Sequence, residues 1–398
     1  MTADIPNLRH LQAASEIGRL GSISLAAASV HLSQSAVTQG IASLEEQVGE
    51  RLFDRTGAGM RPTASGRRFI ARVDRALQRL KGIESELALE QSPGTEPLHR
   101  RVTATQLRAL IAVVAAGGFS LAARELGLSQ PSVYRSARDL ERLCSCSLFR
   151  RRSSGVETTA TARQLARLAT LAFAEIRQGL EEVDELHGRM QSRVVVGCLP
   201  LARTKLLPDA ITQLLSRHPS AKVKVVDGPY DELLQALLHG NIDMMIGALR
   251  LPRPPVQVVQ EPLFDDPLSI VVRCGHPLLS EGTPDVEQLA QINWIVPREG
   301  TPARDHFNAF FEQRGVVPPA NPIECSSLVT TRGLLLQSDR AALLSQRQIR
   351  PDVDGGFLAT LIDPLPGTER SIGLTVRKDW MPTAVQSAFL ETVRQLAV

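Results

Sequence analysis

The chain has 398 residues, of which 43% are hydrophobic, and its formal net charge is +3. This length allows about two to four domains with ordinary apolar cores, and no apolar run is long enough to span a membrane. No secretory leader opens the chain, and its five cysteines lack metal-ligand spacing. We therefore expect a cytoplasmic protein without a membrane segment, a metal site or a cofactor.

One stretch of the chain occurs twice. The first copy reads SLAAASVHLSQSAV from Ser24, and the second reads SLAARELGLSQPSV from Ser120, so equivalent positions lie 96 residues apart. The register holds without a slip to Thr63, which indicates an internal duplication.

Copy one is three residues longer from Leu11 to Ser24 than copy two from Leu110 to Ser120. We therefore expect a remodelled first turn in copy one.

Each copy predicts a short helix, a capped turn and a second helix. Ser33 and Ser129 are typical N-caps, because their hydroxyls can accept a hydrogen bond from a free backbone N–H. Val37, Ile41 and Leu44 recur at helical spacing and leave the opposite face polar. This order is typical of a helix-turn-helix motif, whose second helix reads base edges in the major groove. An ordinary helical hairpin is the alternative, and the ordered recurrence of caps, wing and arginines argues against it.

Further motifs follow in the same order in both copies. Those of copy one are Gly21-Ser22, Ala26-Ala27, Leu32-Ser33-Gln34, Leu44-Glu45, Leu52-Phe53-Asp54-Arg55 and Thr63-Ala64-Ser65-Gly66. Those of copy two are Gly118-Phe119-Ser120, Ala122-Ala123, Leu128-Ser129-Gln130-Pro131, Leu140-Glu141 and Leu148-Phe149-Arg150-Arg151. Together they resemble the winged helix-turn-helix domain of LysR-type transcriptional regulators. Most members of that family have one such domain, so two tandem copies are a departure.

The remaining patterns give the expected domain boundaries. Residues 1–63 and 102–159 are the two winged helix-turn-helix copies, and residues 91–101 form a Pro- and Gly-containing linker. Residues 64–90 and 160–192 are long helices whose apolar residues alternate steps of four and three, which is typical of a two-helix seam. The resemblance implies that such helices dimerise these regulators, and the second is the better candidate for the seam between chains.

From residue 193 the pattern changes to apolar strands that alternate with amphipathic helices, which predicts an α/β domain. The resemblance implies a two-lobed, periplasmic-binding-protein-like effector domain over residues 193–398. Lobe I is expected at about 193–266 and 369–398, and lobe II at about 267–368. The predicted fold class is therefore two tandem, mainly α winged helix-turn-helix copies followed by a two-lobed α/β domain.

Arginine is concentrated in copy two. Residues 100–163 hold 11 Arg and 4 acidic residues, whereas residues 1–72 hold 8 Arg and 6 acidic residues. Arginine suits bidentate contacts with phosphate and guanine, so the wings are predicted to contact DNA; a solvated hairpin tip is the alternative. The predicted DNA-binding residues are Ser33, Gln34, Ser35, Thr38, Gln39, Arg55, Arg61, Ser129, Gln130, Pro131, Ser132, Tyr134, Arg135, Arg138, Arg150, Arg151 and Arg152. Because Tyr134 replaces the small Thr38, copy two is expected to read a different sequence or to bind mainly the DNA backbone.

Ligands of open α/β sheets bind beyond the carboxyl ends of the strands. This rule selects loops in both lobes, where the resemblance also places an inducer cleft. The predicted effector-binding residues are Leu199, Leu201, Arg203, Gly247, Arg298, Thr301, Ser326 and Ser327. Arg203 and Arg298 are candidates to pair with a carboxylate, with surface arginines as the alternative, and Ser327 is also a predicted helix cap. Organic acids and sugar-type metabolites both fit such a cleft.

These features predict a sequence-specific transcriptional regulator that binds operator DNA and responds to a small-molecule effector between two lobes. A homodimer or homotetramer is expected, and RNA polymerase is a candidate partner. The alternatives are a solute-binding protein with vestigial N-terminal helices and a DNA-bridging architectural protein. An enzyme is not expected, because the eight histidines form no metal motif and neither a nucleophile motif nor a phosphate loop appears.

Overall fold

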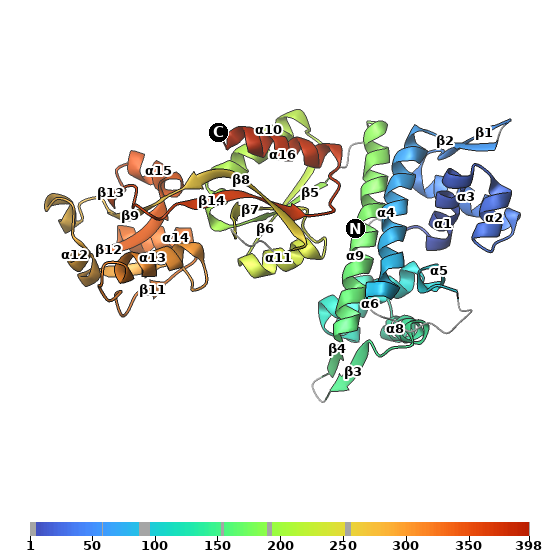
Figure 1. Ribbon diagram of the computed structural model, residues 1–398, viewed down its shortest axis with the longest axis horizontal. Helices are drawn as coiled ribbons and strands as arrows, with labels where there is room; N and C mark the ends of the chain where they lie inside the picture. Colours follow the sequence, from blue (N-terminus) through green and yellow to red (C-terminus); the bar gives the residue numbers. More distant parts are fainter. Residues whose placement is uncertain are drawn as a thin grey trace. The chain divides into compact units, whose positions relative to one another are not determined.

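The computed structural model describes residues 5–57, 59–86, 96–152, 155–188, 193–250 and 256–397. It divides into an N-terminal unit, Met1–Ser192, and a C-terminal unit, Arg193–Val398 (Figure 1). No single helix in these described ranges is long and apolar enough to cross a membrane; α6 and α7, defined below, reach that length and composition only when taken together across a 120° bend.

The two copies in the N-terminal unit fold into the same series of elements. Copy one consists of α1 (Leu8–Leu20), α2 (Ile23–Ser29), α3 (Gln34–Val48), β1 (Phe53–Thr56) and β2 (Gly59–Pro62), and α4 (Ala64–Glu86) follows. Copy two, preceded by α5 (Leu98–Arg101), consists of α6 (Ala104–Ala116), α7 (Phe119–Leu126), α8 (Gln130–Cys144), β3 (Phe149–Arg152) and β4 (Gly155–Thr158), and α9 (Ala160–Leu186) follows. Each element from α6 to α9 begins 96 residues after its counterpart between α1 and α4. The duplication therefore extends over the whole winged domain and into the helix that follows it.

The expected remodelling of the first turn is wrong. Helices α1 and α6 both have 13 residues, and both end at a glycine with left-handed backbone, Gly21 (φ +67°) and Gly117 (φ +71°). Leu11 corresponds to Leu107 rather than to Leu110, so neither copy carries an insertion. Leu107 and Leu110 lie one turn apart on the buried face of α6, and this periodicity makes either one a plausible match from sequence.

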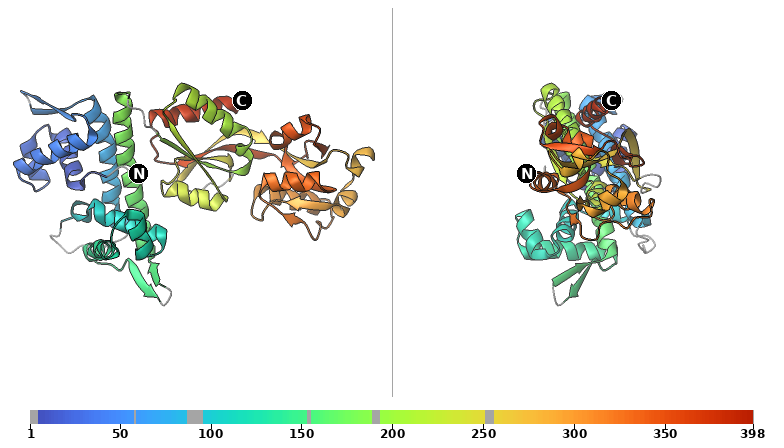
Figure 2. Two further views of the ribbon diagram at one scale, coloured as in Figure 1. Left: turned by 180° about the vertical axis from the view of Figure 1, so that it is seen from behind. Right: turned by 90° about the vertical axis from the view of Figure 1, so that its left-hand side faces the viewer.

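Helices α4 and α9 pack against each other in an antiparallel pair (Figures 1 and 2). Ser65 at the start of α4 lies 3.0 Å from His187 just beyond the end of α9 (Oγ to Nε2), whereas Arg79 late in α4 bonds Glu175 in the middle of α9. Sequence patterning assigns these helices to a seam between chains. The structure instead packs the two apolar seams on each other within one chain, because the duplication supplies both.

The seam residues of both helices are buried in one core that also contains the two winged domains. Those of α4 are Phe69, Val73, Ala76, Leu80 and Ile83, and those of α9 are Leu165, Ala169, Ala172, Ile176 and Val183. The two winged domains and the helix pair thus share one core rather than forming separate domains on a tether.

A buried ion cluster lies within this helix pair. Arg72 has no exposed surface, and its guanidinium donates to Glu175 at 3.0 Å and to Glu182 at 3.1 Å. Arg75 and Arg79 donate to the same Glu175 carboxylate at 3.1 and 3.0 Å. Burial alone would raise the pKa of Glu175, but the hydrogen bond and charge of Arg75, with the hydrogen bonds from Arg72 and Arg79, outweigh it and lower that pKa. The lowered pKa keeps the Glu175 carboxylate ionised at neutral pH.

Replacing Arg72 with alanine leaves Glu182 without this arginine and removes one of the three arginines that bond Glu175. Breaking a buried ion pair costs about 3–5 kcal/mol, so we expect Arg72→Ala to lower the free energy of unfolding of the N-terminal unit by about that amount. Urea denaturation followed by circular dichroism measures the change. Arg68→Ala removes an exposed arginine from the same helix and should change stability by less than about 0.5 kcal/mol. Equal losses for the two variants would contradict the assigned role of Arg72.

The C-terminal unit contains two five-stranded sheets, one in each lobe. The sheet of lobe I has the order β6-β5-β7-β14-β8, and that of lobe II has the order β11-β10-β12-β9-β13. Lobe I consists of β5 (Arg193–Cys198), α10 (Leu206–Arg217), β6 (Lys222–Asp227), α11 (Tyr230–Leu238), β7 (Met244–Ala248), β8 (Val258–Asp266), β14 (Arg370–Arg377) and α16 (Ala384–Leu396). Lobe II consists of β9 (Leu268–Arg273), α12 (Val286–Gln291), β10 (Asn293–Val296), α13 (Pro302–Glu312), β11 (Ile323–Glu324), α14 (Leu328–Leu336), β12 (Arg340–Ser345), α15 (Gln346–Asp354) and β13 (Leu358–Ile362).

The strand patterns explain these sheets. β5 pairs in parallel with β6 and β7, and its Val194, Val195 and Val196 are all buried, as expected for a strand covered on both faces. The returning strand β14 pairs antiparallel with β7 and β8 and completes lobe I. The carboxyl ends of β5, β6 and β7 therefore share one edge, where a ligand of such a sheet would bind.

Candidate nucleic-acid interface and effector site

Helix α3 of copy one presents a polar face away from its core. Its cap is Ser33, whose Oγ accepts the Ala36 N–H at 3.1 Å. Val37 and Leu44 on the opposite face are buried in the core. The predicted DNA-binding residues of this helix and its cap, all exposed, are Ser33, Gln34, Ser35, Thr38 and Gln39. Hydroxyl and amide groups of this kind match the donors and acceptors on base edges in the major groove.

Helix α8 of copy two presents a different face. Ser129 caps it by accepting the Ser132 N–H at 3.3 Å. Its exposed predicted residues are Ser129, Gln130, Pro131 and Arg135, whereas Ser132, Tyr134 and Arg138 are half-buried. Arg135 is thus an exposed cation at the position that Gln39 has in copy one.

Tyr134 and Arg138 are held against the protein. The Tyr134 ring meets the Phe119 ring edge-on at 5.2 Å between centroids, and Arg138 lies over Tyr134 at 5.1 Å. Arg138 also forms an ion pair with Glu141. These contacts engage two residues that sequence reasoning assigned to DNA. Phe119 causes the difference, because copy one has the non-aromatic Ile23 at that position.

Each wing is fastened to its reading helix by a glutamate that sequence reasoning used only as part of a motif. Glu45 Oε1 accepts the N–H groups of Leu52 and Phe53 at 2.7 and 3.2 Å. Glu141 Oε1 accepts the equivalent N–H groups at the start of β3 at 2.8 and 2.9 Å. The signal that could have revealed this role is the same Glu, seven residues before Leu-Phe, in both copies.

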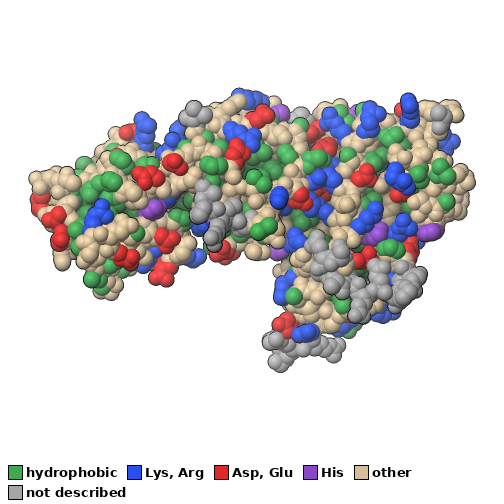
Figure 3. Space-filling model, viewed as in Figure 1, with side chains coloured by type: hydrophobic (Ala, Val, Ile, Leu, Met, Phe, Trp, Pro, Cys, Tyr) green, Lys and Arg blue, Asp and Glu red, His purple; other side chains and the backbone are tan. Residues whose placement is uncertain are grey.

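The predicted wing arginines lie on two-stranded hairpins. Arg55, Arg61 and Arg150 are exposed, and the side chains of Arg151 and Arg152 lie outside the described residues. On the side shown in Figure 3, basic and acidic side chains of the N-terminal unit alternate rather than gathering into one patch. The exposed wing arginines are groups suited to phosphate contact.

Removing the Glu45 carboxylate should loosen the wing of copy one. Hydrogen bonds to a charged group contribute about 1.5–3 kcal/mol, so Glu45→Ala should speed hydrogen exchange of the Leu52 and Phe53 amides by at least about tenfold. Hydrogen–deuterium exchange resolved by peptide measures this rate. Glu46→Ala, which removes an exposed neighbour, should leave it unchanged. Similar exchange in both variants would contradict the fastening role of Glu45.

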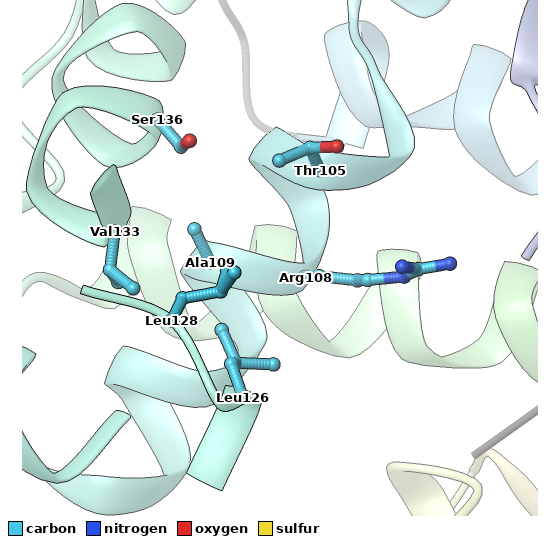
Figure 4. A pocket seen from close by; sticks show the side chains of 7 residues that line it. All are labelled: Thr105, Arg108, Ala109, Leu126, Leu128, Val133 and Ser136. Carbon is cyan, nitrogen blue, oxygen red and sulfur yellow. The ribbon is translucent and has the colours of Figure 1, made fainter. Parts of the chain in front are cut away.

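A hollow of about 220 Å³ lies between α6 and α8, and Leu126, Leu128 and Val133 line one side of it (Figure 4). The Arg108 side chain extends away from these three residues in this view. In copy one the equivalent helix crossing is filled, because a Cβ on Gly40 would lie only 2.9 Å from the His10 ring. The copy-two counterpart of His10 is a glutamine engaged in a capping box, which leaves the space open. The hollow is therefore a packing difference between the copies.

In lobe I the predicted effector residues are largely engaged within the protein. Leu199 and Leu201 are 8% and 7% exposed. Gly247 (φ +152°) packs on Leu199, since a Cβ there would lie 2.4 Å from the Leu199 Cβ. Arg203 donates to a backbone carbonyl at the end of β5 at 3.1 Å and lies 3.4 Å from Asp227. These side chains close the end of β5 themselves.

In lobe II the predicted residues divide into helix caps and exposed groups. The Thr301 hydroxyl donates to the Arg298 carbonyl at 2.7 Å and accepts an N–H in the first turn of α13 at 3.3 Å. Ser327 accepts an N–H in the first turn of α14 at 3.3 Å. Arg298 and Ser326 are exposed. Thr301 and Ser327 thus cap helices, and Arg298, Ser326 and Ser327 are exposed to a ligand.

A pair that sequence reasoning missed lies at the carboxyl edge of lobe I. The Arg250 guanidinium stacks 4.3 Å from the centre of the Tyr230 ring, just beyond β7 and β6. One Arg250 Nη is buried without a hydrogen-bond partner among the described residues. Burial lowers the pKa of Arg250, partly offset by Tyr230, by Asp231 and by Asp305 of lobe II. A half-buried cation at this edge is a recognition group for an anion.

Two capped reading helices with wings, joined to a two-lobed α/β unit, define a DNA-binding regulator with a ligand-binding module. The model of the LysR substrate binding domain matches residues 187–397. The model of the bacterial regulatory helix-turn-helix protein, lysR family, matches twice, at residues 8–67 and 104–163. The chain belongs to the LysR family of transcriptional regulators, which bind DNA and small-molecule effectors and form oligomers.

Individual relatives differ in how much of the chain they cover. The HTH-type transcriptional regulator GalR of Pseudomonas putida is 34% identical over 393 residues, which cover 99% of this chain and 98% of that relative. PcaQ of Agrobacterium fabrum is 29% identical and covers 75% of this chain and 96% of its own length. The alignment with GalR therefore spans both winged copies.

Solved structures share the fold. CbnR, a LysR family transcriptional regulator, has a TM-score of 0.52 at 20% identity and covers 74% of this chain and 98% of its own. A full-length OxyR variant from Pseudomonas aeruginosa has a TM-score of 0.53 at 22% identity, with the same coverage. The uncovered quarter of this chain is about the length of one 96-residue repeat.

Proposed function

We propose that this regulator reads operator DNA with the exposed face of α3 and anchors itself with the wing arginines. The observation that carries this proposal is the capped helix α3, which buries its apolar side and exposes Gln34, Thr38 and Gln39 together. The N-terminal residues of a recognition helix are the ones that reach base edges. Arg55, Arg61 and Arg150 then contact phosphates on either side of the groove.

Copy two contributes a second set of contacts. Its exposed Gln130, Pro131 and Arg135 take part in reading, and Arg151 and Arg152 extend the basic wing. Ser129 and Ser132 remain with the helix cap, where backbone N–H groups favour phosphate. The alternative is an architectural protein that bridges DNA without sequence preference. The exposed hydroxyl and amide groups of the α3 face argue against it, because such groups can distinguish base edges.

A salt-titrated gel shift tests this assignment. Arg150→Ala should weaken binding to all duplexes about equally and lower the slope of log K against log salt by about one, because one phosphate contact is lost. Arg350→Ala removes an exposed arginine from the C-terminal unit and should change neither quantity. An unchanged slope for Arg150→Ala would contradict phosphate contact by this wing, and absence of binding by the unaltered chain would contradict the function.

The effector is a small organic acid or an acidic sugar-type metabolite, bound where the carboxyl edges of the two lobes face each other. Arg250 supplies a half-buried positive charge from lobe I, and Asp305 of lobe II lies close enough to act on it electrostatically. Exposed Arg298 and Ser326 supply further polar contacts from lobe II. Binding there shifts the populations of lobe conformations and thereby the DNA-bound state.

Loss of the Arg250 charge should abolish recognition of an anionic effector. In a thermal-shift screen with aromatic acids, sugar acids and amino acids, we expect at least one acid to raise the Tm of the unaltered chain. Arg250→Gln should remove that rise, whereas Arg350→Gln, at an exposed ion pair with Asp354, should retain it. An unchanged rise in Arg250→Gln would contradict this site.

The assembly and location follow from the same function. A homodimer or homotetramer forms in the cytoplasm, where the DNA is available, and RNA polymerase is the partner through which a bound regulator acts on transcription. The oligomer contacts lie outside the α4–α9 seam, because that apolar seam is already filled within one chain. Light scattering of the full chain measures the oligomer size, and cross-linking to RNA polymerase on a promoter duplex tests the partner.

A further inference from the structure

The two copies in one chain are related by an approximate two-fold axis. Gln12 of α1 donates to the His99 carbonyl, just before copy two, at 2.9 Å. Arg108 of α6, 96 residues after Gln12, donates to the Ile5 carbonyl, just before copy one, at 3.2 Å. Equivalent side chains thus make reciprocal contacts with the segment that precedes the other copy. Reciprocity of this kind defines an isologous, two-fold interface.

The helix pair has the same symmetry. Arg79 of α4 and Glu175 of α9 are equivalent residues, 96 positions apart, and they bond each other at 3.0 Å. In an antiparallel pair, equivalent residues meet only near the two-fold axis. Two identical helices would place like charges together at this point, whereas the diverged copies place opposite charges there. The duplication has therefore produced a complementary pair within one chain.

The composition of the two helices extends this complementarity. Helix α4 carries six Lys and Arg against three acidic residues, whereas α9 carries five acidic residues against three Arg. Fully buried Arg72 meets the acidic side chains of α9, so pairing α4 with a second α4 would bury unpaired positive charge. The charges favour the pair within the chain over the pair between chains.

Resting on the proposed DNA-binding function, we propose that one protomer reads an operator made of two inverted but unlike half-sites. Two-fold related reading helices bind inverted half-sites, because the symmetry of the operator mirrors that of the protein. In this chain the two readers differ at equivalent exposed positions, Gln39 in α3 and Arg135 in α8. Gln39 selects adenine in one half-site, and Arg135 selects guanine at the corresponding position of the other.

The chemistry of these two side chains supports the difference. A glutamine amide pairs with N6 and N7 of adenine, and an arginine fork pairs with O6 and N7 of guanine. Neither Gln39 nor Arg135 forms a hydrogen bond with another residue in the described part of the chain, so both are available to DNA. In a dimer of identical chains with one winged domain each, the two reading helices are identical. Unlike half-sites therefore follow from the duplication, because it places two different reading helices in one chain.

Selection from a random duplex library with the full-length chain tests the proposal. The expected product has two inverted half-sites, with adenine in one and guanine at the matching position of the other. Native mass spectrometry of the selected duplex should show one chain for every two half-sites. Two identical half-sites, or one chain for each half-site, would overturn the proposal while leaving DNA binding intact. Failure to enrich any duplex would overturn the DNA-binding function and this proposal with it.

Exchange of the two readers supplies the residue-level test. Gln39→Arg should change adenine to guanine in one half-site only, with a preference for the new base on the order of tenfold. Arg135→Gln should change guanine to adenine in the other half-site. This variant tests the proposal if Gln39→Arg fails to fold. Gln78→Arg adds the same charge on an exposed face of α4 and should leave the selected bases unchanged. Unchanged base preference in both reader variants would overturn the proposal.

Discussion

The N-terminal unit depends on one buried guanidinium. Arg72 has no exposed surface, and desolvating an arginine costs several kcal/mol unless carboxylates accept its hydrogen bonds. Glu175 and Glu182 of α9 meet this requirement at about hydrogen-bond distance. An apolar seam by itself accepts many partners, whereas a buried charge accepts only a helix with acids at the right positions. The cluster thus decides that α4 pairs with α9, and this pairing sets the positions of both reading domains.

Close packing of the helix pair also depends on Gly179. A Cβ at this position would lie 3.0 Å from the Arg72 Cβ and 3.1 Å from the Phe69 ring. By helix propensity alone, a glycine inside α9 is a weak point of about 1 kcal/mol. In the fold it lets the two helix backbones approach where the ion cluster forms. The local cost is offset by contacts that involve residues about 100 positions apart.

Duplication has kept the scaffold and changed the surface. Glu45 and Glu141 fasten their wings with the same hydrogen bonds, and Ser33 and Ser129 cap their reading helices alike. Side chains on the outer face of the reading helices differ, because that face contributes little to the core. Two chains of a homodimer must share one sequence, and two copies within one chain are free of that constraint. A single protomer therefore presents two different exposed helix faces on one shared core.

The sequence by itself determined the duplication, which is visible as a repeat. It also determined the helix caps, the wings and the alternation of strands and helices, because these arise from interactions between near neighbours in the chain. The exposed polar face of α3 was predictable for the same reason. The partner of α4 was not, since both long helices carry an equivalent apolar seam and the buried ion cluster around Arg72 decided which seams meet. Likewise Leu199 and Gly247 resembled ligand contacts by position, yet they close on each other, while Tyr230 and Arg250 come together from separate strand ends. Tertiary structure alone decided these features, because the contacts join residues that the sequence separates and that no local pattern links.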